Sequence, residues 1–177
     1  FGISRTTMNF ALFTTSLFAK TLCGFFYGSF VRKFGVKKLM VVGGVFAVSA
    51  YLIFSQATGV AFIVIGAVIY GIAHSIGTFS AYNAIINNWF VKRKGLMLGI
   101  VNTSVGLGGM VINPLVGSWI QYHGWNASFL YTGLLIGAIA LPALCLVKIH
   151  PSEKGEVALG SEEASAAQAD QPVVAAK

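Results

Sequence analysis

One lysine lies deep inside an apolar stretch of the sequence. Lys20 is 11 or 12 residues from either end of the run 8–31, which corresponds to roughly 17 Å of helix on each side at ~1.5 Å per residue. A cation at such a depth costs about 2.5–3.5 kcal/mol in a bilayer. Because the first 152 residues contain no Asp or Glu, we expect one of three things to compensate this charge: a water-filled cavity, a carboxylate from elsewhere in the protein, or an anionic ligand.

Three polar residues share a helical face with Lys20. Asn9, Ser16 and Tyr27 lie 11, 4 and 7 positions from it, and these intervals place all four side chains on one side of a helix. The pattern predicts that this face lines a substrate path. A structural ion pair with another helix is the alternative, and both interpretations stay open.

The run 60–88 carries two polar faces at helical spacing. One face holds Tyr70, His74, Gly77 and Ala81, and another holds Ser80, Asn83 and Asn87. We expect one of them to face a cavity, with Tyr70 and His74 as path residues. Histidine titrates near neutral pH, so His74 is a candidate proton relay. The alternative is a neutral, hydrogen-bonded packing residue.

Small and amide residues recur every three or four positions in the run 95–120. They are Gly95, Gly99, Asn102, Gly106, Gly109, Asn113 and Gly117. Glycine inside a helix costs up to ~1 kcal/mol relative to alanine, so the stripe predicts a second helix packed closely against it, with a gating role for that pair. Pro114 predicts a kink, and Asn102 and Asn113 are further candidate path residues.

The composition indicates the elements that carry these residues. With 56% hydrophobic and 10% charged residues and a mean hydropathy of +0.78, a water-soluble single domain is excluded. Five apolar runs, at about 8–31, 39–56, 60–88, 95–120 and 127–147, approach or exceed the ~20 residues that span a membrane. We therefore predict an all-α, polytopic membrane helix bundle over residues 1–150. Residues 151–177 have the composition of a flexible linker or tail.

The connectors between the runs alternate in charge. Those after the first, third and fifth runs contain Arg or Lys, whereas Ser55–Gly59 and Gln121–Trp125 contain neither. The positive-inside rule then predicts an integral membrane protein of a plasma or inner membrane, with the basic loops and the tail in the cytoplasm.

Several function classes find no support in the sequence. No carboxylate pair, HExxH arrangement or base beside a nucleophile is present in the apolar runs, so we expect no enzyme, no metal and no cofactor. Cys23 and Cys145 are interpreted as packing residues. The segment Gly106–Gly109 follows no strand, which excludes a nucleotide loop. The cations form no continuous basic face, so nucleic acid is not an expected partner.

The connector after the first run resembles the signature loop of the major facilitator superfamily. The family pattern is G-x-x-x-D-R-x-G-R-K, and Gly28, Lys33, Gly35, Lys37 and Lys38 match it. Arg32 stands where the family usually has Asp. This departs from the pattern on which a conformational lock between the two halves of such transporters is thought to depend.

Two further stretches resemble the oxalate/formate antiporter and monocarboxylate transporter branches of this family. They are Trp89-Phe90 followed by Lys92–Gly95, and Gly124-Trp125 followed by Phe129, with Asn126 where these branches commonly have Arg. The resemblance implies that the five runs are helices two to six of a twelve-helix protein. It also implies a helix before Phe1, further helices after Lys177, and alternating access.

The function expected from these features is secondary active transport of a small organic anion, such as a monocarboxylate or dicarboxylate, with Lys20 supplying positive potential. Expected partners are this anion, a coupling proton or counter-anion, the lipid bilayer, and the remaining helices of the transporter. Efflux of amphipathic or drug-like compounds and a non-transporting membrane receptor are the alternatives.

Overall fold

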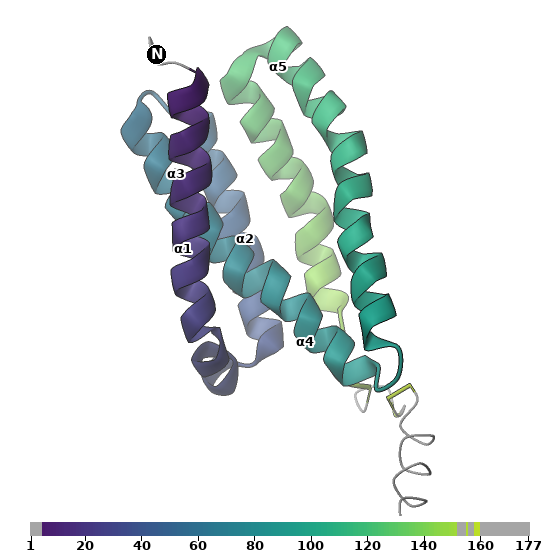
Figure 1. Cartoon of the computed structure of the whole chain (residues 1–177). Helices are drawn as coiled ribbons and strands as arrows, with labels where there is room; N and C mark the ends of the chain where they lie inside the picture. The colour runs from purple at the N-terminus through teal and green to yellow at the C-terminus, as the bar shows by residue number, and fades with distance from the viewer. Residues whose placement is uncertain (1–4, 152–154, 156–157, 160–177) are drawn as a thin grey trace, which may run out of the picture.

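The computed structural model describes residues 5–151, 155 and 158–159 as a bundle of long helices (Figure 1). In chain order these are α1 (Arg5–Phe34), α2 (Val36–Ser55), α3 (Val60–His74), the π-helix η1 (Ser75–Phe79), α4 (Ser80–Trp89) and α5 (Lys94–Leu146). The described residues form no strand; the nearest feature is an isolated bridge between Phe90 and Leu159. The predicted all-α bundle is therefore confirmed.

The helices α1 and α2 and the two halves of α5 meet at single glycines. Gly35 has a φ of 78° and separates α1 from α2, while Gly124 has a φ of 80° inside α5. A side chain would strain such a backbone. At Gly124 the chain reverses, so that α5 consists of two arms, 94–123 and 125–146, that run in opposite directions (Figure 1).

Each of the five apolar runs overlaps a described helix or, for the last two runs, one arm of α5. That each run is a separate membrane span stays a prediction. Four helical stretches are long and apolar enough to cross a membrane, and the fourth is α5 with both of its arms. Each arm exceeds the ~20 residues needed for one crossing. The sequence predicts a break between helices at 121–126. The observed break is much shorter, because the turn takes the single residue Gly124.

A π-helical turn interrupts the third run. In η1 the hydrogen bonds skip one residue more than in an α-helix, which changes the direction in which later side chains point. Gly77 lies against the backbone of Gly43 in α2, and Ala81 packs with Met40 of α2. The prediction that Gly77 and Ala81 share the face of Tyr70 and His74 is therefore wrong.

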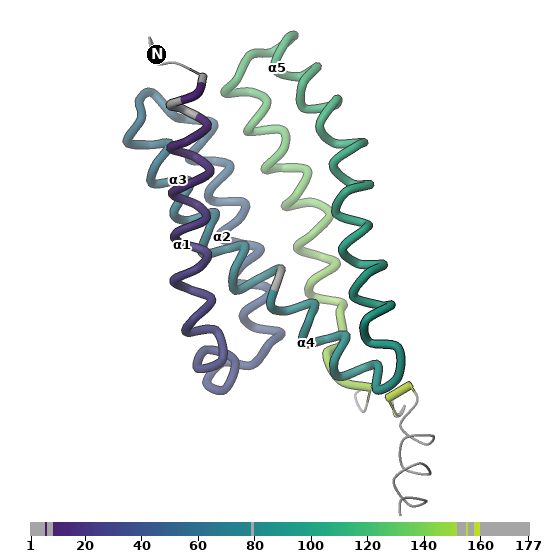
Figure 2. The backbone as a smooth tube through the Cα atoms, in the orientation of Figure 1, coloured from purple at the N-terminus to yellow at the C-terminus, as the bar shows by residue number. Residues whose placement is uncertain are grey.

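Helix α2 connects the two sides of the bundle. It packs on α3 and η1 on one side and on the second arm of α5 on the other, where Gly133 meets Tyr51 and Gly137 meets Val48. Figure 2 shows this second arm lying between α2 and the first arm. The buried core follows these contacts and includes Leu39, Met40, Ala50, Phe54, Ile63, Ala67, Ala73, Ala81 and Ile86.

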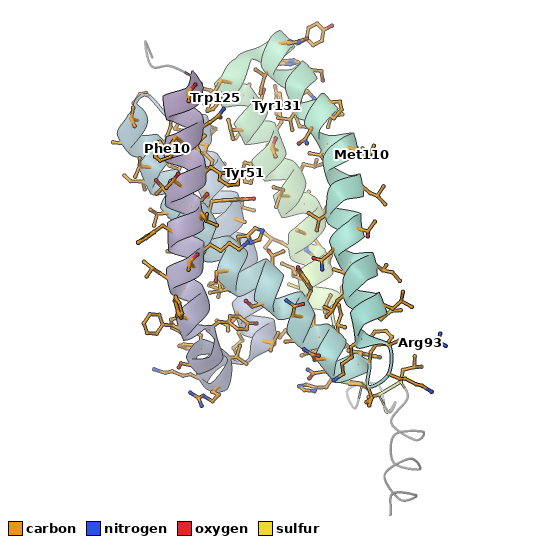
Figure 3. The ribbon with its side chains drawn as sticks, in the orientation of Figure 1. Phe10, Tyr51, Arg93, Met110, Trp125 and Tyr131 are labelled. Carbon is orange, nitrogen blue, oxygen red and sulfur yellow. The ribbon has the colours of Figure 1, made fainter. Side chains whose placement is uncertain are left out.

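The first arm of α5 lies at the edge of the bundle. Most of its large apolar side chains are exposed, and Figure 3 shows Met110 pointing away from the other helices. A methyl group added at Gly95, Gly99, Gly106 or Gly117 would meet nothing within 4 Å, and one at Gly109 would meet only Asn113 of the same helix. The closely packed partner predicted for this stripe is thus not among the described residues, and it stays a prediction.

Pro114 lies inside the first arm of α5, and Gly124 is the residue of this helix whose φ and ψ are non-helical. The reversal of the chain in α5 is therefore made by Gly124, and the kink at Pro114 stays a prediction.

The basic connectors gather at one end of the bundle. The α1–α2 turn, the α4–α5 connector and the end of α5 all lie at the bottom of Figure 1, and we call this the basic end. Leu159 is also held there, because its N–H donates to Trp89 (2.8 Å) and its carbonyl accepts from Val91 (3.0 Å). Most of the predicted flexible segment 151–177 lies outside the described residues.

Candidate functional site

Helices α1 and α3 approach closely at Gly71. A methyl group there would overlap the carbonyl oxygen of Ser16 and would come within 2.9 Å of the Ala19 side chain. Glycine therefore allows the two backbones to touch. One turn beyond this contact, Lys20 of α1 and His74 of α3 lie on the walls of the same cavity.

This lysine cavity has a volume of about 210 Å³. Its walls are formed by Phe13, Ser16, Leu17, Lys20, Tyr70, Gly71 and His74. It combines an ammonium group with an imidazole, a phenol and a hydroxyl. The ammonium group of Lys20 gives this cavity a positive charge, and His74 is a further polar group in its wall.

A larger cavity adjoins the lysine cavity. It has a volume of about 430 Å³ and is lined by Asn9, Leu12, Phe13, Ser16, Tyr51, Phe54, Ala67, Tyr70 and Phe129. We call it the aromatic cavity. Phe13, Ser16 and Tyr70 line both spaces, so the polar face of α1 continues from one cavity into the other.

Aromatic rings from three helices form one wall of the aromatic cavity. Tyr51 meets Tyr70 edge to face, with ring centroids 5.9 Å apart, and Phe54 lies 5.4 Å from Phe129. Trp125 stands behind Phe129 at 4.6 Å. Edge-to-face and offset ring pairs of this kind favour a fixed wall, with about 0.5–1.5 kcal/mol for each pair.

This aromatic wall was not predicted from the sequence. Tyr51, Phe54 and Phe129 lie near the ends of their runs, and Trp125 lies just before one, where aromatic residues are common in any membrane protein because they lie at the bilayer interfaces. Their spacing therefore contained no signal that distinguishes a cavity wall from an interfacial belt.

Some polar atoms of the site have their hydrogen bonds satisfied within one helix, and others do not. The hydroxyl of Ser16 donates to the Phe13 carbonyl at 3.1 Å. The Nδ1 atom of His74 and the hydroxyl of Tyr27 are buried, and neither has a hydrogen-bond partner among the described residues. A buried polar atom without a partner costs about 1–3 kcal/mol, so both are candidates to bond water, a ligand or another helix.

Comparison with known proteins identifies the family. The chain matches the sequence profile of the Major Facilitator Superfamily over residues 1–175. The chain belongs to the major facilitator superfamily. Proteins of this family are integral membrane proteins with a helical-bundle fold, in agreement with the helices described above.

Three relatives illustrate the similarity. The chain is 29% identical to the uncharacterized MFS-type transporter YcxA of Bacillus subtilis (strain 168), over 72% of this chain and 31% of that protein. It is 27% identical to the oxalate:formate antiporter of Oxalobacter formigenes, over 72% and 30%. It is 26% identical to monocarboxylate transporter 9 of Gallus gallus, over 71% and 24%. The resemblance to these two branches is confirmed, and the chain spans less than a third of each relative.

Not all the predicted path residues meet in the cavities of this major facilitator chain. Asn9, Ser16, Lys20, Tyr70 and His74 line the two cavities, whereas Tyr27, Asn102 and Asn113 do not. Asn102 accepts a hydrogen bond from the Tyr82 hydroxyl at 3.2 Å, which joins α4 to the first arm of α5. Asn113 is exposed on the same arm.

The major facilitator signature loop lies at the basic end. Gly28, Arg32 and Lys33 are in the last turns of α1, Gly35 forms the turn, and Lys37 and Lys38 begin α2. All six residues are exposed, and the ammonium of Lys33 lies 5.5 Å from the ring centre of Phe34. The positive φ of Gly35 explains why the motif has glycine there. The conformational role of the loop stays a prediction.

Proposed function

We propose that this chain is part of a secondary active transporter that moves a small organic anion by alternating access. The observation that carries the proposal is the lysine cavity, in which Lys20 and His74 come together beside the aromatic cavity. The proposed substrate is a monocarboxylate or dicarboxylate whose carboxylate binds near Lys20.

Electrostatics supports an anionic substrate. A charge inside a low-dielectric bundle creates a stronger potential than one in water. The first 152 residues contribute no acidic side chain to oppose it. The Tyr70 hydroxyl and the buried Nδ1 of His74 are further polar groups of the same cavity.

The relatives support the same substrate class. Two of them are named as an oxalate:formate antiporter and a monocarboxylate transporter. Their cargoes, as named, are small carboxylates. Alternating access would release the substrate chemically unchanged, whereas an enzyme would convert it.

The first test is carboxylate uptake into proteoliposomes that contain the full-length protein. We expect Lys20→Gln to lower uptake roughly ten- to hundredfold, because a charge-assisted hydrogen bond contributes about 1.5–3 kcal/mol. Lys20→Arg should keep part of the activity. Lys94→Gln at the start of α5 removes a cation far from the cavities and should have no effect. If Lys20→Gln and Lys20→Ala both leave rate and affinity unchanged, the lysine is structural and the proposal is wrong.

The aromatic cavity favours a second candidate function. Its volume of about 430 Å³ is twice that of the lysine cavity, and such a space can hold an amphipathic compound of the kind that efflux transporters move. Lys20 disfavours a cationic cargo by repulsion. Competition separates the two candidates, because excess formate or oxalate should block uptake of a labelled carboxylate but should not block efflux of an amphipathic dye.

A further inference from the structure

Two more cavities lie along another face of α1. The first, of about 480 Å³, includes Phe18 and Leu22 in its walls, and the second, of about 470 Å³, includes Phe30 and Phe34. Cys23 and Ile72 line both. The two cavities therefore adjoin and form one apolar groove beside α1, which we call the α1 groove.

The basic half of the α1 groove has the length of one lipid leaflet. It follows α1 from Cys23 to Phe34, or about 16 Å at ~1.5 Å per residue. One half of a ~30 Å hydrocarbon core measures about 15 Å. An acyl chain that enters from the basic end would therefore reach Cys23 at the middle of the bilayer.

The walls of this half are large apolar side chains that the protein leaves exposed. Phe30, Phe34, Val42 and Phe46 are 37%, 47%, 43% and 39% exposed. They belong to α1 and α2, which are joined by the turn at Gly35. Hydrocarbon is the partner that such a surface matches inside a membrane.

Charge at the end of the groove distinguishes it from a plain apolar surface. Lys38 lines the same cavity as Phe34. Arg32, Lys33 and Lys37 are its neighbours in the chain, and no acidic residue occurs before Glu153. A site with apolar walls and a lysine at headgroup depth is complementary to a lipid whose headgroup carries a net negative charge.

We propose that the α1 groove binds an anionic phospholipid, with one acyl chain against Phe30, Phe34 and Val42 and the phosphate at Lys38. The lipid comes from the leaflet at the basic end. This proposal depends on the membrane location of the family and is independent of which solute is transported.

Photocrosslinking in nanodiscs tests the proposal on the full-length protein. The probes are phosphatidylglycerol and phosphatidylcholine that carry the same diazirine on one acyl chain, and mass spectrometry maps the adducts. We expect phosphatidylglycerol to give about fivefold more adduct than phosphatidylcholine on the segment from Cys23 to Phe34, since a lysine near the membrane surface contributes about that factor. The exposed face around Met110 should show no such preference.

Two charge variants separate a built site from a general surface attraction. Lys38→Gln should reduce the phosphatidylglycerol adduct to the phosphatidylcholine level, and Lys38→Arg should restore it. Lys37→Gln removes a neighbouring exposed cation that does not line the groove, and it should keep the preference. Equal adducts from both lipids, equal effects of Lys37→Gln and Lys38→Gln, or no adducts because another helix fills the groove would each overturn the proposal.

Discussion

At the scale of single residues, the site depends on one contact between backbones. Gly71 lets α1 and α3 touch at Ser16, and this contact determines where Lys20 and His74 lie relative to each other. Part of this arrangement could be predicted, because regular helical spacing puts Asn9, Ser16 and Lys20 on one face. The close approach at Gly71 could not, since a single glycine in an apolar run has many structural explanations.

The contact at Gly71 gives a stability prediction. Gly71→Ala places a methyl group against the Ser16 carbonyl, and such overpacking should lower the free energy of unfolding by about 1–3 kcal/mol. The matched control is Gly24→Ala in α1, where the new methyl group would meet only the Ser75 hydroxyl at an ordinary 3.7 Å. Thermal unfolding of the two purified variants in detergent measures the difference. Equal stabilities would show that the α1–α3 contact is less tight than described.

At the scale of elements, the π-turn of the third run explains why Gly77 and Ala81 do not share the face of Tyr70 and His74. The runs and their ends were predictable from apolar length and basic connectors. The π-turn at Ser75–Phe79 was not, because it has no proline and its one glycine fits a regular helix equally well. The turn changes the helix phase, so that Tyr70 and His74 line a cavity while Gly77 packs on α2.

The π-turn leads to a prediction that a deletion can test. Removal of Thr78, an exposed residue of η1, should convert the turn to α-helix, because a π-turn holds one residue more than an α-turn. Helix α4 should then keep its direction relative to α3, with Tyr82 near Asn102 and Ala81 against Met40. Removal of Ile65, an exposed residue of the regular helix α3, should instead rotate all that follows by about 100° and cause a large loss of stability in thermal unfolding. Equal losses from the two deletions would mean that the π-turn does not absorb an extra residue.

At the scale of the whole molecule, the basic connectors share one end of the bundle (Figure 1). The basic connectors therefore mark one end of the bundle, although successive helices run in opposite directions. This arrangement was predictable from the charges alone, because the alternation of basic and uncharged connectors requires an alternation of helix direction. The side of the membrane on which the basic end lies is a proposal, and we propose the cytoplasm.

The proposed orientation can be measured with single cysteines. A membrane-impermeant maleimide applied to intact cells should label Gln56→Cys, in the exposed α2–α3 connector opposite the basic end, and should not label Arg93→Cys in the exposed α4–α5 connector. Both variants are made in a protein that has no other reactive cysteine. Both should react after the cells are permeabilised. Labelling of Arg93→Cys in intact cells would reverse the orientation.

The single-residue turn at Gly124 also has a mechanical consequence. The two arms are held together near the turn, where the Tyr131 ring of the second arm contacts Trp119 and His123 of the first. We therefore expect the hairpin to move as one unit. Its second arm holds α2 through Gly133 and Gly137. A tilt of α2 would therefore be carried across the hairpin and would swing the glycine-lined surface of the first arm toward or away from whatever lies next to it.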